Sequence, residues 1–217
     1  MKKVSLLSLV ALASLVGALG VAPSASASAP VLCKIKPSTH KCGSANMYPV
    51  GTTISGKLAG SSFSITTESK ETIQACSGSE FSGTLNENSV QPFIGVTSFT
   101  ATGCAEPNMT IITWPKTPTQ DRITYIPNTD NGKWWGGTEI KVGLRLLYPE
   151  APTTWNCRYQ LTEGELVGGA APVLAYTGGP GYAGPGAATG NEWYCPKKVR
   201  VWAKYALSPM PIYVEEL

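Results

Sequence analysis

Histidine and charged residues are scarce in this sequence. Of the 217 residues, one is histidine, and Asp, Glu, Lys and Arg together make up 14%. A catalytic site of the Ser-His-Asp or Cys-His kind needs a histidine base, which here could only be His40. No G-x-S-x-G or comparable nucleophile motif accompanies this residue, which lies in a short polar loop between Cys33 and Cys42. We therefore interpret His40 as a solvent-exposed loop residue and expect no histidine-based catalysis.

Sequence motifs that bind metals, phosphates or nucleotides are lacking as well. The cysteines show no C-x-x-C spacing, and a single histidine leaves too few of the usual ligands for a zinc site. The glycines of 178–190 are not followed by the helical pattern that a phosphate-cradling or dinucleotide-binding loop requires. The sequence therefore predicts neither a metal site nor a cofactor.

The excess of positive charge is small. The formal net charge is +3, and it falls to +1 when Lys2 and Lys3 are removed, because 15 basic residues then remain against 14 acidic ones. A dedicated nucleic-acid-binding protein carries a clear basic excess. We therefore expect no nucleic-acid partner.

A long hydrophobic run occurs once, near the N-terminus. Residues 1–29 combine the basic Lys2 and Lys3, an uncharged stretch rich in Leu, Val and Ala, and small residues suited to signal peptidase. Cleavage after Ala27 fits the A-x-A rule, and cleavage after Ala29 is the alternative. An uncleaved membrane anchor is disfavoured because serine and glycine dilute the run. We expect a signal peptide, a mature chain without a membrane span, and a secreted or cell-envelope-associated protein.

Cysteine is present in an even number. The six cysteines are Cys33, Cys42, Cys76, Cys104, Cys157 and Cys195. An even count in an exported chain indicates disulfides rather than free thiols. Six cysteines allow about 15 connectivities, and the sequence alone does not choose among them. Pairing of sequence neighbours (33–42, 76–104 and 157–195) is favoured, because each pair then brackets one self-contained segment.

Helical periodicity is missing outside the N-terminal run, and a period of two is present instead. It is clearest over Glu139–Leu161, where apolar residues occupy every second position on both sides of a turn at 149–152. Such alternation predicts two half-buried strands joined in a hairpin, which we expect at the centre of the fold. Short segments of similar character, punctuated by glycine and proline, occupy most of the remaining chain.

This pattern favours an all-β fold. We predict a disulfide-stapled antiparallel β-sandwich, Ig-like or jelly-roll-like, in a single domain over residues 52–217. An irregular N-terminal arm over residues 30–51 precedes this domain. Residues 168–190 contain eight glycines and three prolines, so we predict a Gly/Pro-rich loop there.

One segment resembles an arrangement found in many uncharacterised exported bacterial proteins. Cys76-Ser-Gly-Ser-Glu-Phe81-Ser-Gly83 is followed by Phe99-Thr-Ala-Thr-Gly-Cys104. In those proteins a cysteine-led strand with Phe-x-Gly is followed, after a short hairpin, by an aromatic strand that ends in cysteine. The resemblance implies a disulfide between residues 76 and 104 and an extracellular β protein. It brings no known activity, substrate or catalytic residue.

Aromatic side chains are the best candidates for binding. Trp134 and Trp135 follow an Asn-Gly turn and precede two glycines, and Trp202 lies on the polar face of its predicted strand. Tyr176 and Tyr182 are the large side chains of the predicted loop. Exposed rings on a rigid β scaffold commonly contact sugar rings or protein partners. The alternative is that the tryptophans cap the sandwich or pack beneath the loop.

Two function classes remain open. The favoured one is a non-catalytic exported or envelope-associated binding or structural module that contacts polysaccharide or a surface protein. The alternative is an extracellular polysaccharide hydrolase, which needs two carboxylates at a set separation. The carboxylates considered for that role are Asp130, Glu139, Glu163 and Glu165. Since no enzyme motif accompanies them, we expect the protein not to be an enzyme.

Overall fold

Regular structure in this chain is almost entirely β-strand. The computed structural model describes residues 29–104, 111–113, 119–136, 139–145, 154–161, 163–183 and 196–217. The predicted signal peptide therefore lies outside the described residues, apart from Ala29. Among the described residues, a helix with the length and hydrophobicity of a membrane span does not occur.

The elements differ widely in length, from short bridging strands to one strand of 16 residues. In chain order they are β1 (Pro30–Cys33), the 3₁₀ helix η1 (Ser44–Asn46), β2 (Thr53–Leu58), β3 (Phe63–Thr67), β4 (Thr72–Glu87), β5 (Phe93–Cys104), β6 (Ile111–Thr113), β7 (Thr119–Tyr125), β8 (Gly132–Trp135), β9 (Glu139–Arg145), β10 (Thr154–Leu161), β11 (Glu163–Val167), β12 (Val173–Ala183), β13 (Lys198–Ser208) and β14 (Tyr213–Glu216).

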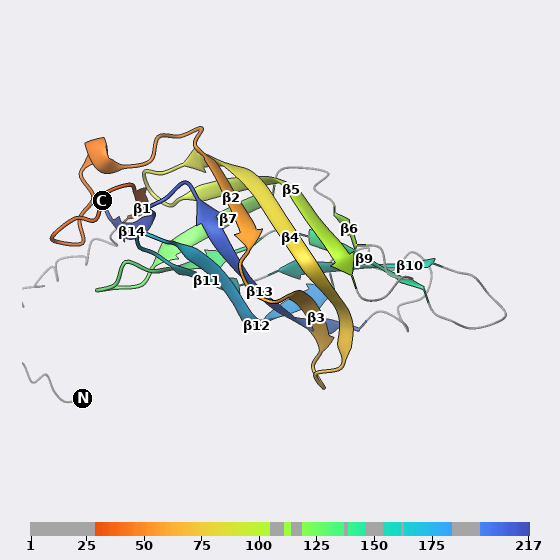
Figure 1. Ribbon diagram of the computed structural model, residues 1–217. Coiled ribbons are helices and arrows are strands. Elements are labelled where there is room, and N and C mark those ends of the chain that lie inside the picture. Colours follow the sequence, from red (N-terminus) through yellow and green to blue (C-terminus); the bar gives the residue numbers. More distant parts are fainter. Residues whose placement is uncertain are drawn as a thin grey trace, which may run out of the picture.

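Eight of these strands close into a ring. The pairing order β13–β3–β4–β5–β7–β8–β11–β12 returns to its start because β12 also pairs with β13. All pairings in this ring are antiparallel. β2 pairs with both β13 and β4 and occupies the same gap as β3, further along those two strands (Figure 1). The strands therefore form a closed barrel.

The prediction of an all-β, disulfide-bonded chain is confirmed, but the predicted sandwich is corrected. A period of two shows that one face of each strand is buried, which is equally true of a sandwich and of a barrel. Closure needs strands that bend, and β-bulges bend them. Such irregularities interrupt the pairing of β4 with β5 between Ser82 and Gly83, and that of β12 with β13 between Thr177 and Gly179.

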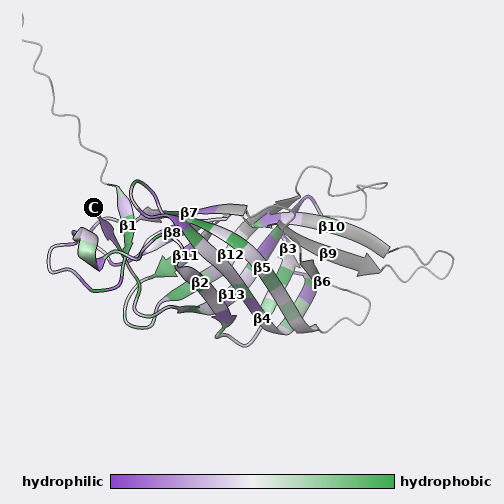
Figure 2. Cartoon of the chain, turned by 90° about the horizontal axis from the view of Figure 1, so that it is seen from above, coloured by the Kyte–Doolittle hydropathy of each residue, from purple (hydrophilic) through white to green (hydrophobic). Residues whose placement is uncertain are grey.

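Inward-facing side chains fill the barrel. Buried residues alternate with less buried ones along β13 and most of β4, and Figure 2 shows hydrophobic and hydrophilic residues interspersed along the strands. Large rings meet edge to face inside, with centroid distances of 5.8 Å between Phe81 and Trp134 and 5.3 Å between Phe81 and Tyr205. Each such pair adds about 0.5–1.5 kcal/mol to the stabilisation that burial provides. The barrel interior is therefore a packed core.

The Gly/Pro-rich loop predicted over 168–190 is wrong for residues 173–183. These residues form β12, which pairs with β10, β11 and β13. Glycine is needed here for close strand approach, because a Cβ at Gly179 would lie 2.6 Å from the carbonyl oxygen of Glu163. Residues 184–190 lie outside the described part of the chain.

The N-terminal arm, predicted to be irregular over 30–51, begins with a strand. β1 pairs with the last strand, β14, in a two-stranded sheet at one end of the barrel (Figure 1). The buried Asn88 side chain, just after β4, fixes this arm. Its Nδ2 donates to the carbonyl oxygens of Leu32 and Tyr48 at 3.0 and 2.9 Å, and its Oδ1 accepts from Leu32 N at 2.7 Å.

Two of the predicted disulfides are confirmed. They join Cys33 to Cys42 and Cys76 to Cys104. Cys157 is also disulfide-bonded, and its predicted partner, Cys195, lies outside the described residues. The first bond closes the loop after β1, and the second joins Cys76 in β4 to its pairing partner Cys104, the last residue of β5.

The hairpin predicted over Glu139–Leu161 is present, but it is not central. β9 and β10 pair antiparallel over seven residue pairs. β10 joins the barrel through three residue pairs with β12, and β9 and β6 follow it at the end of the sheet order. Alternation predicted the two strands correctly, whereas their position depends on pairing with β12, which was predicted to be a loop.

Candidate functional site

Two strands of the barrel, β8 and β13, each carry a tryptophan on the outer face. Side chains alternate between the two faces of a strand, so Trp135 on β8 points outward while Trp134 points into the core. On β13 the same alternation turns Trp202 outward. Both outward indoles are 41% exposed. From β8 through β11 and β12 to β13 there are three strand spacings, which is about 14 Å measured along the curved sheet.

The Trp135 ring is oriented by polar contacts from two strands. Its Nε1 donates to Thr124 Oγ1 on β7 at 3.2 Å. On its own strand, Lys133 Nζ lies 5.8 Å from the ring centroid, near the outer limit of cation–π geometry. These contacts use the polar edge of the indole and one side of the ring, and they leave much of its apolar surface to solvent.

The Trp202 ring extends across the outer surface from β3 to β12. Its Nε1 lies 3.4 Å from Thr66 Oγ1, at the long end of hydrogen-bonding distance. The six-membered ring also lies close to Gly178 on β12, where a Cβ would approach Trp202 Cζ2 to 2.7 Å. Gly178 has φ +83°, which favours glycine, and its carbonyl oxygen accepts from Arg200 Nη1 at 3.2 Å. The bulge of β12 thus provides the surface on which this indole packs.

A groove of about 340 Å³ lies on the same face. Its lining comes from β8, β11, β12 and the residue after β7, and consists of Ile126, Lys133, Glu163, Gly164, Glu165, Ala175, Thr177 and Gly179. Neither tryptophan is one of these lining residues, but Trp135 is the pairing partner of Glu163 and Trp202 that of Thr177, so each lies next to a lining residue. Lys133 Nζ and Glu163 Oε1 form an ion pair at 2.9 Å. The groove therefore combines flanking apolar rings with a polar lining.

Two predicted binding residues lie inside the barrel instead. Trp134 is 1% exposed, and its Nε1 donates to the buried Asp121 Oδ2 at 2.8 Å. Tyr176 is buried too, and burial raises the pKa of its hydroxyl well above the usual value, with Asp121 and Tyr205 acting in the same direction. The cavity beside them holds about 20 Å³, which is room for one water molecule and for no larger ligand.

The remaining candidates have different outcomes. Tyr182 lies on β12, but its side chain is outside the described residues, as is that of Glu139. Glu163 and Glu165 face outward two positions apart on β11, which places their backbones roughly 7 Å from each other. The structure therefore brings one predicted carboxylate pair into the groove, and it places Asp130 elsewhere.

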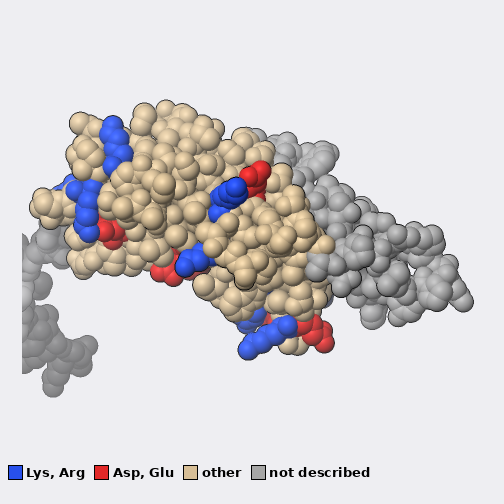
Figure 3. Space-filling model, in the orientation of Figure 1, with Lys and Arg blue, Asp and Glu red and all other residues tan. Residues whose placement is uncertain are grey.

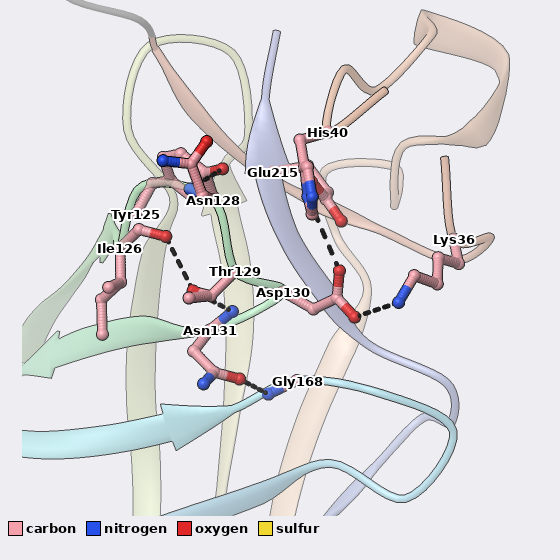
Figure 4. A network of polar contacts seen from close by, with 10 residues as sticks. All are labelled: Lys36, His40, Tyr125, Ile126, Asn128, Thr129, Asp130, Asn131, Gly168 and Glu215. Carbon is pink, nitrogen blue, oxygen red and sulfur yellow. Dashed lines mark hydrogen bonds and ion pairs between the residues drawn. The ribbon is translucent and has the colours of Figure 1, made fainter. Parts of the chain in front are cut away.

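A second polar cluster lies where the N-terminal arm meets β14. His40 Nδ1 lies 3.2 Å from Glu215 Oε2 and 3.7 Å from Asp130 Oδ1, and Lys36 Nζ lies 2.7 Å from Asp130 Oδ2 (Figure 4). Burial raises the pKa of the Glu215 carboxyl; contact with His40 lowers this pKa, and contact with Asp130 raises it. Within the described segments, His40, Asp130 and Glu215 form the group whose side-chain atoms could hold a metal ion.

Sequence reasoning missed this cluster. His40 was interpreted as an exposed loop residue, and 40% of its side chain is exposed, but the ring contacts a fully buried carboxylate. His40 and Glu215 are 175 positions apart in the sequence, and no local spacing connects either of them to Asp130. Only the structure shows that Glu215 is fully buried, a state that charged residues seldom adopt without a partner.

No protein-family model matches this chain, and no similar protein was found among curated proteins or solved structures. Function therefore has to be inferred from the geometry and chemistry of the two sites.

Proposed function

We propose that this protein is an exported, non-catalytic binding module that holds a neutral polysaccharide in the groove between Trp135 and Trp202. The observation that supports this most strongly is the pair of partly exposed tryptophans on β8 and β13, with a polar groove over the two strands between them. The strands that carry the two indoles lie three spacings apart, roughly 14 Å along the sheet, and this span suits several sugar units of a chain better than one monosaccharide.

The chemistry of the groove matches that of a sugar chain. A sugar ring has an apolar face, which can stack on an indole, and a rim of hydroxyls, which needs donors and acceptors. Lys133, Glu163 and Thr177 supply both kinds of group on the groove lining. Because the barrel strands hold both indoles, little conformational entropy is lost on binding.

The charge distribution favours a neutral ligand. In the groove the charge of Lys133 is matched by Glu163 at 2.9 Å, and Glu165 adds a further negative charge to the lining. Figure 3 shows that on the drawn face charged side chains are few and that both signs are present. An anionic polymer would find no concentrated positive surface there.

Export is part of this proposal. Disulfides persist in oxidising compartments, and the two bonds described here are compatible with an extracellular location. The hydrophobic N-terminal run and the resemblance to exported bacterial proteins support the same conclusion. We propose a secreted or envelope-associated location.

A pull-down on insoluble polysaccharides tests the binding function. Oxidised protein is incubated with cellulose, chitin, xylan and cell-wall preparations, and the bound fraction is measured. Trp135→Ala and Trp202→Ala should each weaken binding to the polysaccharide that is retained, and the double variant should abolish it. Val167→Ala is the matched control, because Val167 is 39% exposed on β11 but does not line the groove. Undiminished binding by the double variant would contradict the proposal.

The second candidate function is a polysaccharide hydrolase that uses Glu163 and Glu165. Both side chains line the groove from the same face of β11, and their backbones are roughly 7 Å apart. However, a glycosidase acid needs surroundings that keep it protonated, whereas Glu163 is paired with Lys133 and Glu165 is exposed. Release of reducing sugar that is lost in both Glu163→Gln and Glu165→Gln would favour the enzyme over the binding module.

A further inference from the structure

We propose that His40, Asp130 and Glu215 bind a divalent transition-metal ion of the Zn²⁺ type, at the junction of the N-terminal arm, the β7–β8 turn and β14. This site is separate from the tryptophan groove and does not depend on the function proposed for it.

The distances between the ligand atoms fit a common ion. One side-chain atom from each of the three residues can be chosen so that all lie within 4.8 Å of one another. His40 Nδ1 lies 3.2 Å from Glu215 Oε2 and 3.7 Å from Asp130 Oδ1. Nitrogen and oxygen ligands bound to one tetrahedral zinc ion are roughly 3.3–3.6 Å apart, given bonds of about 2.0–2.2 Å. Little movement is therefore needed to enclose an ion.

Unpaired carboxylate oxygens are an independent sign of a missing positive charge. Glu215 is 0% exposed, and its Oε1 has no hydrogen-bond partner among the described residues. Asp130 Oδ1 is also buried and without such a partner. An unpaired buried carboxylate oxygen is costly, and two neighbouring carboxylates repel each other. A cation between them would relieve both costs.

The backbone holds the three residues in place without help from their side chains. The His40 carbonyl oxygen accepts from Glu216 N at 3.1 Å, and the Asp130 carbonyl oxygen accepts from Val214 N at 3.0 Å. The Cys33–Cys42 disulfide closes the loop that carries His40. Figure 4 shows these segments converging, with the Asp130 side chain directed toward His40 and Lys36. The ligand set is therefore preorganised by three separate parts of the chain.

The donor set selects the kind of ion. One imidazole nitrogen and two carboxylate oxygens are typical zinc ligands, and three protein ligands leave a fourth position for water. Calcium prefers six or more oxygen ligands, so it fits poorly here. Lys36 contacts Asp130 through Oδ2 at 2.7 Å and leaves Oδ1 for the ion. Because the Lys36 side chain is 59% exposed, solvent screens its repulsion of the ion.

Calorimetric titration of the tag-free, chelator-treated, oxidised protein with ZnCl₂ tests the site. We expect one Zn²⁺ ion per chain, a higher melting temperature with zinc, and no response to CaCl₂. His40→Ala and Asp130→Asn should each weaken zinc binding by at least about tenfold. Loss of a residue that only orients a metal ligand already weakens binding by about that factor, and loss of the ligand itself should cost at least as much. Both side chains are partly exposed, so these variants should fold even if Glu215→Gln does not.

Two further variants separate the site from non-specific binding. Lys36→Gln removes a positive charge next to Asp130 and should tighten zinc binding several-fold, the opposite of the ligand variants. Glu71→Gln, on the exposed turn before β4, should leave the zinc affinity unchanged. The proposal is overturned if zinc does not bind stoichiometrically, or if His40→Ala binds it as tightly as the wild type. It is also overturned if Glu215→Gln is more stable than the wild type in saturating zinc. That result would mean that the Asp130 and Glu215 carboxyl groups share a proton and that no metal ion lies between them.

Discussion

The inner and outer faces of the barrel place neighbouring residues in opposite environments. Trp134 and Trp135 are consecutive on β8, yet 1% of Trp134 and 41% of Trp135 is exposed. Inside, the Trp134 indole donates to the buried Asp121 at 2.8 Å. Outside, the Trp135 indole donates to Thr124 at the surface, at 3.2 Å. A single step along the strand thus separates a residue that stabilises the fold from one that can meet a ligand.

This difference indicates a division between stability and binding. On the inner face aromatic rings contact each other and bury most of their surface. On the outer face two rings touch the barrel mainly at their edges and at Gly178. Substitutions on the inner face should therefore change the free energy of unfolding, and those on the outer face should change ligand binding.

Replacing Trp134 should have the largest effect. Trp134→Ala removes a ring that packs against Phe81 and the indole N–H that donates to Asp121. The free energy of unfolding should therefore fall by about 3–5 kcal/mol. Urea denaturation followed by circular dichroism measures it. Trp135→Ala is the matched control, and it should change this free energy by less than about 0.5 kcal/mol. Similar losses in the two variants would break the division between the faces.

High pH should weaken the inner face next. Burial raises the pKa of Tyr159, Tyr176 and Tyr205 above about 10, the value for an exposed phenol. Because these phenols ionise more easily once unfolded, the stability that they contribute is complete below about pH 10 and is lost above it. The loss is up to about 1.4 kcal/mol per tyrosine for each pH unit.

Denaturation at a series of alkaline pH values measures this loss. Tyr205→Phe removes one of the three phenols, so its stability should fall less steeply with pH than that of the wild type. If the two slopes are equal, ionisation of the core tyrosines is not the cause of alkaline unfolding.

Replacing Gly178 should have the smallest effect on stability and sharpen the comparison on the outer face. Gly178→Ala places a methyl group against the Trp202 ring at a residue with φ +83°, so we expect a loss of about 1 kcal/mol together with weaker polysaccharide binding. Gly51→Ala is a close control, since φ is +92° there and nothing lies within 4 Å of the added Cβ. If both variants bind polysaccharide equally well, the packing of Trp202 on Gly178 has no role in binding.

Local patterns predicted the strands well but not which of their residues form the site. Alternation gave β9 and β10, and the even cysteine count fitted the confirmed Cys33–Cys42 and Cys76–Cys104 bonds. The same alternation could have separated Trp134 from Trp135, but it does not say which of the two faces the core. The glycines of β12 were interpreted as a loop because glycine disfavours strands, whereas tertiary contacts require them.

The sequence by itself determined the all-β character and the supply of aromatic side chains, and it favoured the two cysteine pairs that the structure confirms. Each of these depends on residues close together in the chain: a period of two, neighbouring cysteines and short turns. Only the tertiary structure decided that the strands close into a barrel, that Trp135 and Trp202 flank one groove, and that His40 meets Glu215. The physical reason is that strand pairing joins segments far apart in sequence, and local periodicity carries no information about which strands become partners.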